Sequence, residues 1–471
     1  KLFFYAKLKF ELNMIFYRLK QFIFLVGDFL VLHLSLWLAL IIRYGQLPKI
    51  TLWQSHLLPF SLIYLFWLII FYLNNLYNLN LLKSRFVFLL NLSRGLVVNF
   101  ILAALIFYFS ATEFTPRRIL FLNLLVFVFI FLGWRSIFNR LLRQVGPLSN
   151  LLIISGNQDA RELIKNQFIL PSYGLKLKAV IELENKDFKP FSGQKLYLTY
   201  DLQNLEEIIK EEKISTIIVS NLQKYQEVVE ATYRLLPQGI IFFDLSTFYE
   251  SFLREIPISA TSEIWFLENF RSSQKNFYDH LKRILDILLA SILIPISLLL
   301  YPFIILGILT SSPGLIFYHQ KRVGKNGREF ILTKFRSMVV EAEKNGPVWS
   351  LKNDSRVTKF GHFLRGSHFD ELPQLWNILK GEMSFVGPRP ERPEFVKELA
   401  EKIPHYHLRH LIKPGLTGWA QINYPYGSSV EDSLKKLHYD LYYVKNRSLF
   451  LDLSIILKTF NTFLRKPGKE K

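Results

Sequence analysis

The chain contains no cysteine, and this absence removes several classes of chemistry at once. Without a thiol there is no disulfide framework, no thiolate nucleophile and no cysteine-ligated zinc site. Acidic residues are also scarce: 38 Asp and Glu stand against 58 Lys and Arg, which leaves a net charge of +20. A basic surface attracts nucleic acid, anionic lipid headgroups or phosphorylated substrates. Because half of the chain is hydrophobic, we expect lipid and phosphate as partners and no nucleic acid.

The hydrophobic residues gather in four stretches near the start of the 471 residues. A membrane-spanning helix needs roughly 20 residues, which the first two stretches provide and the last two barely approach. The predicted spans are about 22–42, 52–73, 95–110 and 119–134. We identify no paired charges inside them. Lys and Arg are denser before the first span, between the second and third, and after the fourth, so the positive-inside rule places everything after residue 140 in the cytoplasm.

Residues 146–270 alternate short apolar runs with helical patterns, which predicts a Rossmann-like α/β domain with a parallel sheet. The expected strands are about 151–155, 177–181, 216–220 and 239–244, with a helix at 160–167. The turn S-G-N-Q-D-A at 155–160 has one glycine where a dinucleotide-binding loop needs three. We therefore predict a scaffold without a cofactor. Dimerisation and regulation both stay open as its role.

A second apolar run, 287–309, carries no charge but contains Pro295 and Pro302. Proline in a helix interior breaks or kinks the helix. Basic residues flank both ends of the run, which favours a segment that enters and leaves through the cytoplasmic face. We therefore predict a re-entrant helical hairpin over 284–309 with its kink at Pro295. An ordinary fifth transmembrane helix is the alternative.

Adjacent carboxylates, Asp370 and Glu371, follow Arg365 in a polar, basic region. Pro373 is tolerated only in the first turn of a helix, so we predict a helix from about Asp370 to Lys380. Neighbouring residues on a helix point about 100° apart, so the two acids should have different roles. One could attack phosphorus, and the other could hold Mg²⁺ through oxygen. Alone, such a pair is far more often an acidic turn that caps a helix.

The surrounding motifs make the chemical interpretation stronger. They are Q-K-R-V-G at 320–324, K-F-R-S-M at 334–338, G-E-M-S-F-V-G-P-R-P at 381–390, K-P-G-L-T-G-W-A-Q-I-N at 413–423 and Y-D-L-Y-Y-V-K-N at 439–446. Lys334, Arg336 and Arg389 are cationic donors suited to a pyrophosphate. The glycines and prolines form turns whose backbone N–H groups could approach an anion.

Together these motifs resemble the bacterial sugar transferase family, the polyprenyl-phosphate glycosyl-1-phosphate transferases. The resemblance covers about 282–463, and the upstream spans and α/β region resemble the larger, exopolysaccharide-type branch. It implies a mixed α/β monotopic catalytic domain after the membrane-helical N-terminal bundle and the Rossmann-like domain. The expected domains are 1–145, 146–270 and 271–471. Small family members often carry Ser before the re-entrant proline, whereas this chain has Ile294.

The resemblance also implies the reaction. Asp370 would attack a UDP-sugar and release UMP, and undecaprenyl phosphate would then take the sugar phosphate from the aspartyl intermediate. Glu371, with Asp370 close by, would bind Mg²⁺, and Arg389 would contact phosphate. The further expected phosphate or substrate contacts are Arg365, Lys282, Arg283, Arg322, Lys334, Arg336, Asp440 and Tyr442, the last two as matches to a family motif without an assigned role.

The resemblance places the chain in the bacterial inner membrane, as a multi-pass protein with a cytoplasmic catalytic domain. We expect a homodimer, and the sugar stays open among glucose, galactose and N-acetylated sugars.

One alternative is a membrane-bound nucleotide-sugar dehydratase or epimerase, which needs a glycine-rich loop and a Tyr-x-x-x-Lys pair. Tyr278 and Lys282 have that spacing, but they lie outside the α/β region. A non-catalytic membrane scaffold is the other alternative, but it leaves the charged cluster unexplained.

Overall fold

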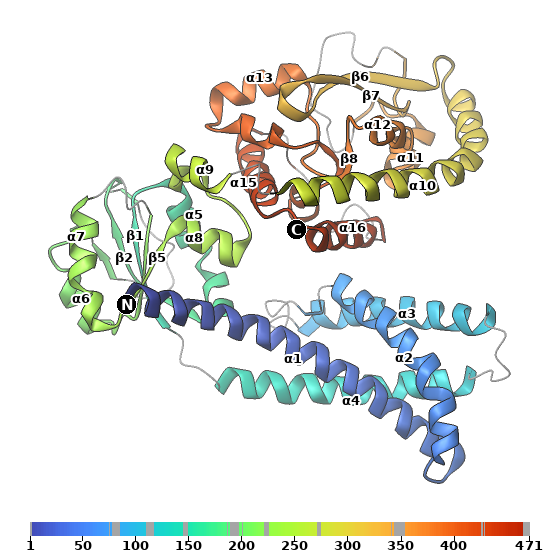
Figure 1. Cartoon of the computed structure of the whole chain (residues 1–471), viewed down its shortest axis with the longest axis horizontal. Coiled ribbons are helices and arrows are strands. Elements are labelled where there is room, and N and C mark those ends of the chain that lie inside the picture. Colours follow the sequence, from blue (N-terminus) through green and yellow to red (C-terminus); the bar gives the residue numbers. More distant parts are fainter. Residues whose placement is uncertain are drawn as a thin grey trace. The chain divides into compact units, whose positions relative to one another are not determined.

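The computed structural model describes residues 2–74, 76–77, 85–109, 117–144, 149–185, 187–188, 197–199, 201–220, 226–270, 275–340, 342, 354–424, 427 and 429–464. The chain divides into two compact units, residues 1–245 and residues 246–471. In Figure 1 the first unit runs from blue to green and the second from yellow-green to red. This division differs from the predicted boundary at residue 270, because residues 246–270 pack within the second unit.

The four predicted membrane spans are helices. Their bounds are α1 Leu2–Tyr44, α2 Ile50–Leu73, α3 Arg85–Phe109 and α4 Arg117–Gln144. The parts long and apolar enough to cross a membrane are Phe22–Tyr44, Ile50–Leu73, Phe88–Tyr108 and Arg118–Phe138. The third and fourth parts have 21 residues each and are longer than predicted. The predicted third span begins after Arg94 and the predicted fourth span ends before Arg135, whereas α3 and α4 continue through these residues. With α10 in the second unit, the described residues hold five such helices, which indicates a membrane protein.

Aromatic side chains fill the interior of α1–α4. The rings of Phe71 and Phe127 stack with their centroids 5.8 Å apart, and Trp67 meets Phe127 edge-on at 6.0 Å. Offset and edge-to-face arrangements of this kind are the favourable ones for aromatic pairs. A small polar bridge crosses the same interior, where the Ser35 hydroxyl donates to the side-chain oxygen of Asn123 at 3.1 Å. These contacts tie α1, α2 and α4 together.

One prediction about the spans is wrong, because they do contain a paired charge. Arg135 of α4 donates to Asp28 of α1 at 2.5 Å, and both side chains are almost fully buried. The Arg135 guanidinium also lies 4.0 Å from the centre of the Phe24 ring. The two residues are 107 positions apart, so sequence spacing cannot pair them. A charge inside a span stays buried only when it is matched, and this pair joins α1 to α4.

The α/β region holds a five-stranded parallel sheet with strand order β3-β2-β1-β4-β5. The strands are β1 Ser149–Ser155, β2 Leu175–Glu182, β3 Tyr197–Thr199, β4 Thr216–Val219 and β5 Ile241–Asp244. The helices between them are α5 Gln158–Lys165, α6 Leu205–Glu211 and α7 Gln226–Arg234, with 3-10 turns at Gln167–Tyr173 and Leu236–Gln238. The predicted parallel sheet is confirmed.

Two polar residues at the carboxyl ends of the strands, where a nucleotide would have to bind, already bind other groups of the protein. Asn157 caps α5 by accepting from the Ala160 N–H at 2.9 Å, and its amide donates to the Ser220 carbonyl at 3.0 Å. Glu182, at the end of β2, is buried and accepts from Arg161 at 2.8 Å. An acid at this position would need a free carboxylate to bind a ribose. These contacts favour the predicted scaffold without a cofactor, which stays a prediction.

The second unit begins with a segment that packs on its long C-terminal helices. Its elements are α8 Leu245–Phe248, a π-helical turn Tyr249–Leu253, a 3-10 turn Ile258–Ala260 and α9 Glu263–Asn269. Ile256 is fully buried and its N–H donates to the His438 carbonyl at 3.0 Å. Glu250 forms an ion pair with Lys445 at 2.7 Å. These contacts explain why the segment belongs to the second unit.

The rest of the second unit is a mixed α/β region with a β6–β7 hairpin and a short parallel β8–β9 pair. The strands are β6 Phe317–Val323, β7 Glu329–Phe335, β8 Ser384–Val386 and β9 Gly415–Thr417. The helices are α10 Asn276–Ser311, α11 Lys359–Ser367, α12 Gln374–Lys380, α13 Pro393–Lys402, α14 Trp419–Asn423, α15 Val430–Asn446 and α16 Leu449–Leu464. Short 3-10 turns are η7 Lys325–Gly327, η8 Phe369–Glu371 and η9 Tyr406–Leu411.

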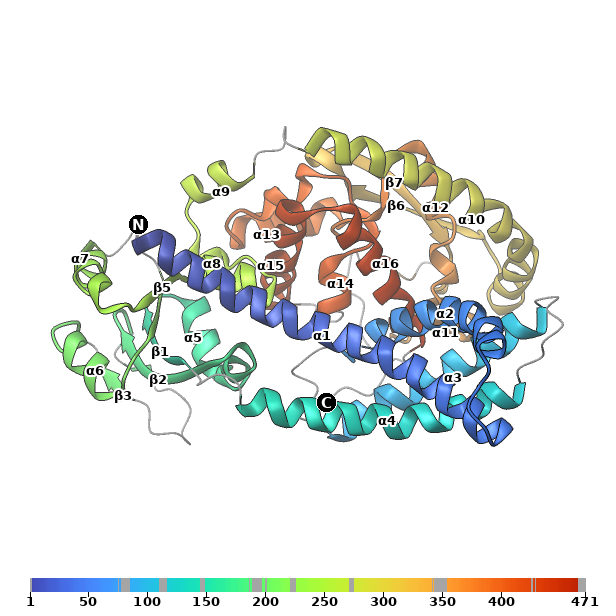
Figure 2. The ribbon, with the colours of Figure 1, turned by 60° about the horizontal axis from the view of Figure 1, so that its bottom comes forward.

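The apolar run after residue 284 lies in one helix rather than in two separate ones. α10 continues through both Pro295 and Pro302. Figures 1 and 2 show that it bends and curves along the edge of the second unit. The Ser297 hydroxyl donates to the Ile294 carbonyl at 2.8 Å beside the first proline. The predicted re-entrant hairpin would therefore be a single bent helix, α10. That both of its ends lie at one face of the membrane stays a prediction.

Candidate active site

The two acids lie in a separate turn between α11 and α12, which corrects the predicted helix start. α11 ends where His368 adopts a left-handed conformation with φ 57°. Asp370 and Glu371 then form the 3-10 turn η8, and α12 begins only at Gln374, after Pro373 in the N-cap position. The predicted end at Lys380 is confirmed. The sequence pattern missed the positive φ of His368, because only a few per cent of non-glycine residues adopt it.

The two acids meet different surroundings. Asp370 is 6% exposed. Burial and the neighbouring charge of Glu371 raise the pKa of Asp370, although nearby cations act against them. Burial also acts on Glu371, but Arg389 and Lys334 hold its pKa below the ordinary value. Glu371 accepts from Arg389 at 2.9 Å. Environments that push two carboxyl pKa values apart divide acid roles at active sites.

The β6–β7 hairpin supplies one side of the cation cluster around these acids. Tyr318 pairs with Lys334 and Arg322 with Phe330, so Lys334 and Arg322 lie on the same face of the hairpin. Burial lowers the pKa of Lys334 to about 8, although Glu371 and Asp370 act in the opposite direction. Arg365 of α11 contributes from the other side, with its Nε donating to Ser337 at 2.9 Å and its charge acting on Asp370.

The Gly-Pro-Arg-Pro turn is held through its backbone at three successive carbonyls. Pro388 O accepts from the Gly415 N–H at 2.9 Å, Arg389 O from Arg409 at 3.0 Å and Pro390 O from Arg322 at 3.0 Å. Gly415 is required here, because a Cβ on it would lie 2.0 Å from the Gly387 nitrogen. The turn is therefore rigid, and it presents the Arg389 guanidinium to Glu371.

Asp440 supports this turn through Arg409, and Tyr442 packs against another aromatic side chain. Asp440 is buried and pairs with Arg409 at 2.8 Å. Burial raises the pKa of Asp440 to about 6, although Arg409 acts against it. Tyr442 packs beside Trp419, with ring centroids 5.9 Å apart. Sequence reasoning missed Arg409, which links Asp440 to the Arg389 carbonyl, because no local motif marks it.

Three further predicted phosphate ligands are engaged elsewhere in the protein. Lys282 forms an ion pair with Asp452 at 2.7 Å. Arg283 donates to the carbonyls of Ile378 and Leu379, both at 2.6 Å, at the end of α12. Arg336 donates to Pro313 O at 3.1 Å and to Ser312 O at the end of α10. Cationic side chains at helix C-termini stabilise the last carbonyls, so Arg283 and Arg336 serve here as helix caps.

The donor chemistry of the acid pair suits a hard cation. Among the described residues no group of three or more His, Asp or Glu side chains could hold a metal ion. Mg²⁺ does not require such a cage, because it commonly binds one or two carboxylates, water and substrate phosphates. Asp370 and Glu371 provide two adjacent carboxylates, and Arg389 contacts Glu371 through Oε1. The residues present therefore fit the predicted Mg²⁺.

Comparison with known proteins identifies relatives of the second unit. The profile of the bacterial sugar transferase family matches residues 277–466. An Aeromonas hydrophila UDP-N-acetylgalactosamine-undecaprenyl-phosphate N-acetylgalactosaminephosphotransferase is 43% identical over 41% of this chain and 45% of its own length. A Xanthomonas campestris UDP-glucose:undecaprenyl-phosphate glucose-1-phosphate transferase is 46% identical over 33% of each chain. The uncharacterized sugar transferase EpsL of Bacillus subtilis is 40% identical over 40% of this chain and 89% of its own length.

The chain belongs to the bacterial sugar transferase family. The matched residues contain η8, the β6–β7 hairpin and the Gly-Pro-Arg-Pro turn, so the family resemblance and the cation cluster coincide. The alignments cover less than half the length of the first two relatives. The first four membrane helices and the parallel sheet lie outside the family match.

Proposed function

We propose that this chain transfers a sugar 1-phosphate from a UDP-sugar to undecaprenyl phosphate, as an early membrane step of exopolysaccharide, O-antigen or capsule synthesis. The observation that supports the proposal most is the divided acid pair, in which Arg389 holds Glu371 ionised while Asp370 is buried beside it. Two of the relatives carry undecaprenyl-phosphate transfer in their names.

Asp370 is the proposed nucleophile. One of its oxygens attacks the sugar-bearing phosphorus of the UDP-sugar, the bond between the two phosphates breaks, and UMP leaves. An oxygen of undecaprenyl phosphate then attacks the same phosphorus and releases the Asp370 carboxylate. Phosphoryl transfer depends mainly on positioning and on neutralising charge. Lys334, Arg365 and Arg389 provide that positive charge around the acid pair.

Glu371 and Asp370 would hold Mg²⁺. The ion, when bound, supplies charge neutralisation for the pyrophosphate. Arg389 keeps Glu371 ionised, which is the state that a metal ligand needs. Asp440 and Arg409 contribute indirectly, because Arg409 binds the Arg389 carbonyl and so holds the turn in place.

The dehydratase or epimerase alternative finds no support in the structure. Its Tyr-x-x-x-Lys pair lies on α10, outside the parallel sheet. The Tyr278 hydroxyl donates to Asp452 at 2.7 Å, and Lys282 pairs with the same carboxylate. Both side chains are therefore used in an internal network of the second unit.

Purified full-length protein should release UMP when it is given UDP-sugars in turn, undecaprenyl phosphate and Mg²⁺. Asp370→Asn should lower this rate by more than about 10³-fold, because an amide cannot act as the nucleophile. Glu371→Gln should raise the Mg²⁺ concentration needed for half-maximal rate. Glu398→Gln, which removes an exposed carboxylate on α13, is the matched control and should leave the rate unchanged. Full activity of Asp370→Asn would exclude it as the nucleophile.

The pH dependence of kcat/KM for the UDP-sugar should follow the two perturbed groups. Asp370 must be ionised to attack, so its raised pKa should place the acid limb above the ordinary aspartate value of about 4. Lys334 must be protonated to attract phosphate, so activity should fall as the pH rises through about 8. Lys334→Arg keeps its charge at high pH and should remove the alkaline limb only. An alkaline limb that persists in Lys334→Arg would assign that limb to another group.

The proposed cytoplasmic active site requires both ends of α10 to lie on one side of the membrane. Because the chain lacks cysteine, single cysteines can be labelled selectively with an impermeant maleimide in intact cells. Lys397→Cys, on exposed α13, should stay unlabelled until the cells are opened. Gln46→Cys, between α1 and α2, should be labelled from outside and is the positive control. Labelling of both cysteines from outside would show that α10 crosses the membrane.

A further inference from the structure

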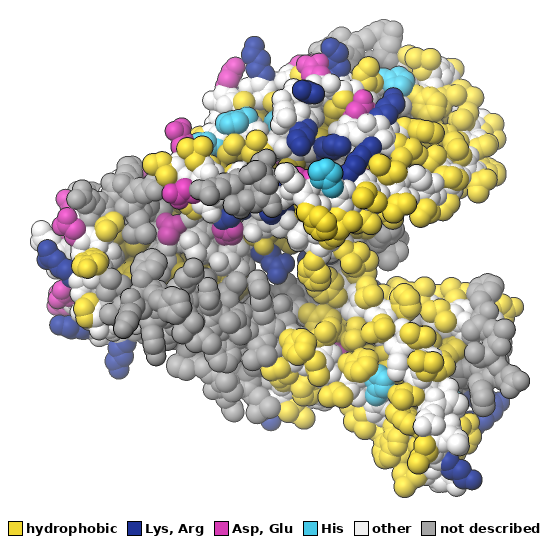
Figure 3. Space-filling view, viewed as in Figure 1, with side chains coloured by type: hydrophobic (Ala, Val, Ile, Leu, Met, Phe, Trp, Pro, Cys, Tyr) yellow, Lys and Arg dark blue, Asp and Glu magenta, His cyan; other side chains and the backbone are white. Residues whose placement is uncertain are grey.

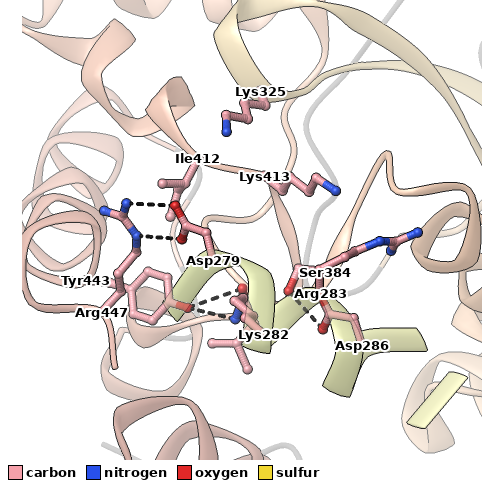
Figure 4. Close-up of a pocket in the computed structure, with 11 residues that line it drawn as sticks. Asp279, Lys282, Arg283, Asp286, Lys325, Ser384, Ile412, Lys413, Tyr443 and Arg447 are labelled. Atoms are coloured by element: carbon pink, nitrogen blue, oxygen red, sulfur yellow. Dashed lines mark hydrogen bonds and ion pairs between the residues drawn. The ribbon is translucent and has the colours of Figure 1, made fainter. Parts of the chain in front are cut away.

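A cationic pocket lies at the start of α10, away from the acid pair. It has a volume of about 70 Å³. Its lining consists of Asp279, Lys282, Arg283, Asp286, Lys325, Ser384, Val386, Ile412, Lys413, Tyr443 and Arg447. Figure 4 shows side chains from α10 on one side and the ammonium groups of Lys325 and Lys413 on the other. Five cations and two acids line the pocket, so positive charge is in excess.

Both acids of the pocket already have partners within the protein. Asp279 pairs with Arg447 at 3.2 Å. Asp286 accepts from the Ser384 hydroxyl and from the Phe385 N–H, both at 3.1 Å. These bonds, apart from the one to Phe385, appear as dashed lines in Figure 4. Neither carboxylate forms an ion pair with Lys325 or Lys413 among the described residues, and two acids cannot balance five cations.

Two lysines of the pocket lack a protein partner. In the part of the chain that the structure describes, neither Lys325 nor Lys413 forms a hydrogen bond or ion pair. A Cβ on Gly381 would lie 3.2 Å from the Lys413 ammonium and 3.3 Å from the Arg283 guanidinium, so these two cations crowd one point. Burial and the charges of Arg283 and Lys325 lower the pKa of Lys413, although Asp286 and Asp279 act in the opposite direction. Lys413 is half-buried beside two other cations, Arg283 and Lys325, and a bound anion would stabilise its charge.

The pocket is separate from the acid pair. Arg283 binds the last carbonyls of α12, whereas Asp370 and Glu371 precede its first residue. At about 1.5 Å per residue, the seven residues of α12 place about 10 Å between the two ends. An anion at Lys413 would therefore not contact the reacting phosphorus at Asp370.

The pocket adjoins a hydrophobic surface. Ile284, Leu285 and Leu288 follow Arg283 on α10, and each is at least 39% exposed. Figure 3 shows a cluster of Lys and Arg side chains beside the hydrophobic surface over α10. An anionic membrane lipid is complementary to this arrangement. Its phosphate lies at the interface, where it would meet the cationic pocket, and its acyl chains lie beyond, where they would meet the apolar side chains.

We propose that this pocket binds the headgroup phosphate of an anionic membrane lipid through Lys325 and Lys413, and so holds the start of α10 at the membrane interface. The acyl chains would lie along the exposed face of α10. This role is independent of sugar transfer, and it differs from the expected lipid contacts of Lys282 and Arg283, whose charges serve Asp452 and the end of α12.

Full-length protein in a neutral detergent provides the test, with dioctanoylphosphatidylglycerol as the probe and inorganic phosphate as the lipid-free comparison. The lipid should raise the thermal midpoint saturably, which yields an apparent Kd. The double variant Lys325→Gln with Lys413→Gln should raise this Kd by about 25-fold, because each lysine near the surface contributes about fivefold. The matched control, Lys397→Gln with Lys402→Gln on α13, removes the same charge and should leave the Kd unchanged.

Lys325→Gln alone, at an exposed position, covers the case in which the double variant fails to fold, and should raise the Kd by about fivefold. Equal Kd values for the pocket and control variants would overturn the proposal, since binding would then follow net charge alone. Inorganic phosphate that binds as tightly as the lipid would overturn the lipid assignment in favour of a free phosphate. Because the readout is binding, failure of the sugar-transfer proposal would leave these results unaffected.

Discussion

The ion pair between Arg389 and Glu371 organises the charges of the second unit. Arg389 extends from a turn whose three successive carbonyls are bound by Gly415, Arg409 and Arg322, so the backbone that carries its side chain is fixed. The positive charges of Arg389 and Lys334 keep the pKa of Glu371 below its ordinary value, whereas burial and the negative charge of Glu371 raise the pKa of Asp370. The positive charges of Lys334, Arg365 and Arg389 limit that rise. The chemical difference between the two adjacent acids thus depends on their burial and on the cations that surround them.

Features carried by long, regular patterns could be predicted from the sequence. The four apolar helices and the parallel sheet have lengths and periodicities that few other structures share. Predictions that depended on one residue's backbone were less accurate. α12 starts four residues late because His368 adopts a positive φ, and α10 continues through two prolines that predicted a break. A bend in a longer helix accommodates those prolines as well as a break does.

For the site, local motifs located the acid pair, the hairpin cations and the Gly-Pro-Arg-Pro turn. Local motifs could not predict the roles of the remaining charged residues, because each of these residues binds a partner that is distant in the sequence. Asp440 forms an ion pair with Arg409, and Lys282 forms one with Asp452. The buried pair of Asp28 and Arg135 escaped the sequence for the same reason, with 107 residues between its partners.

The central claim is that Asp370 becomes covalently bonded to the sugar phosphate, and mass spectrometry tests it directly. Full-length protein incubated with its UDP-sugar and Mg²⁺, but without undecaprenyl phosphate, should gain the mass of one sugar phosphate on the peptide that contains Asp370. Addition of undecaprenyl phosphate should remove the adduct. An active protein that forms no adduct under these conditions, or carries it on another residue, would contradict the account.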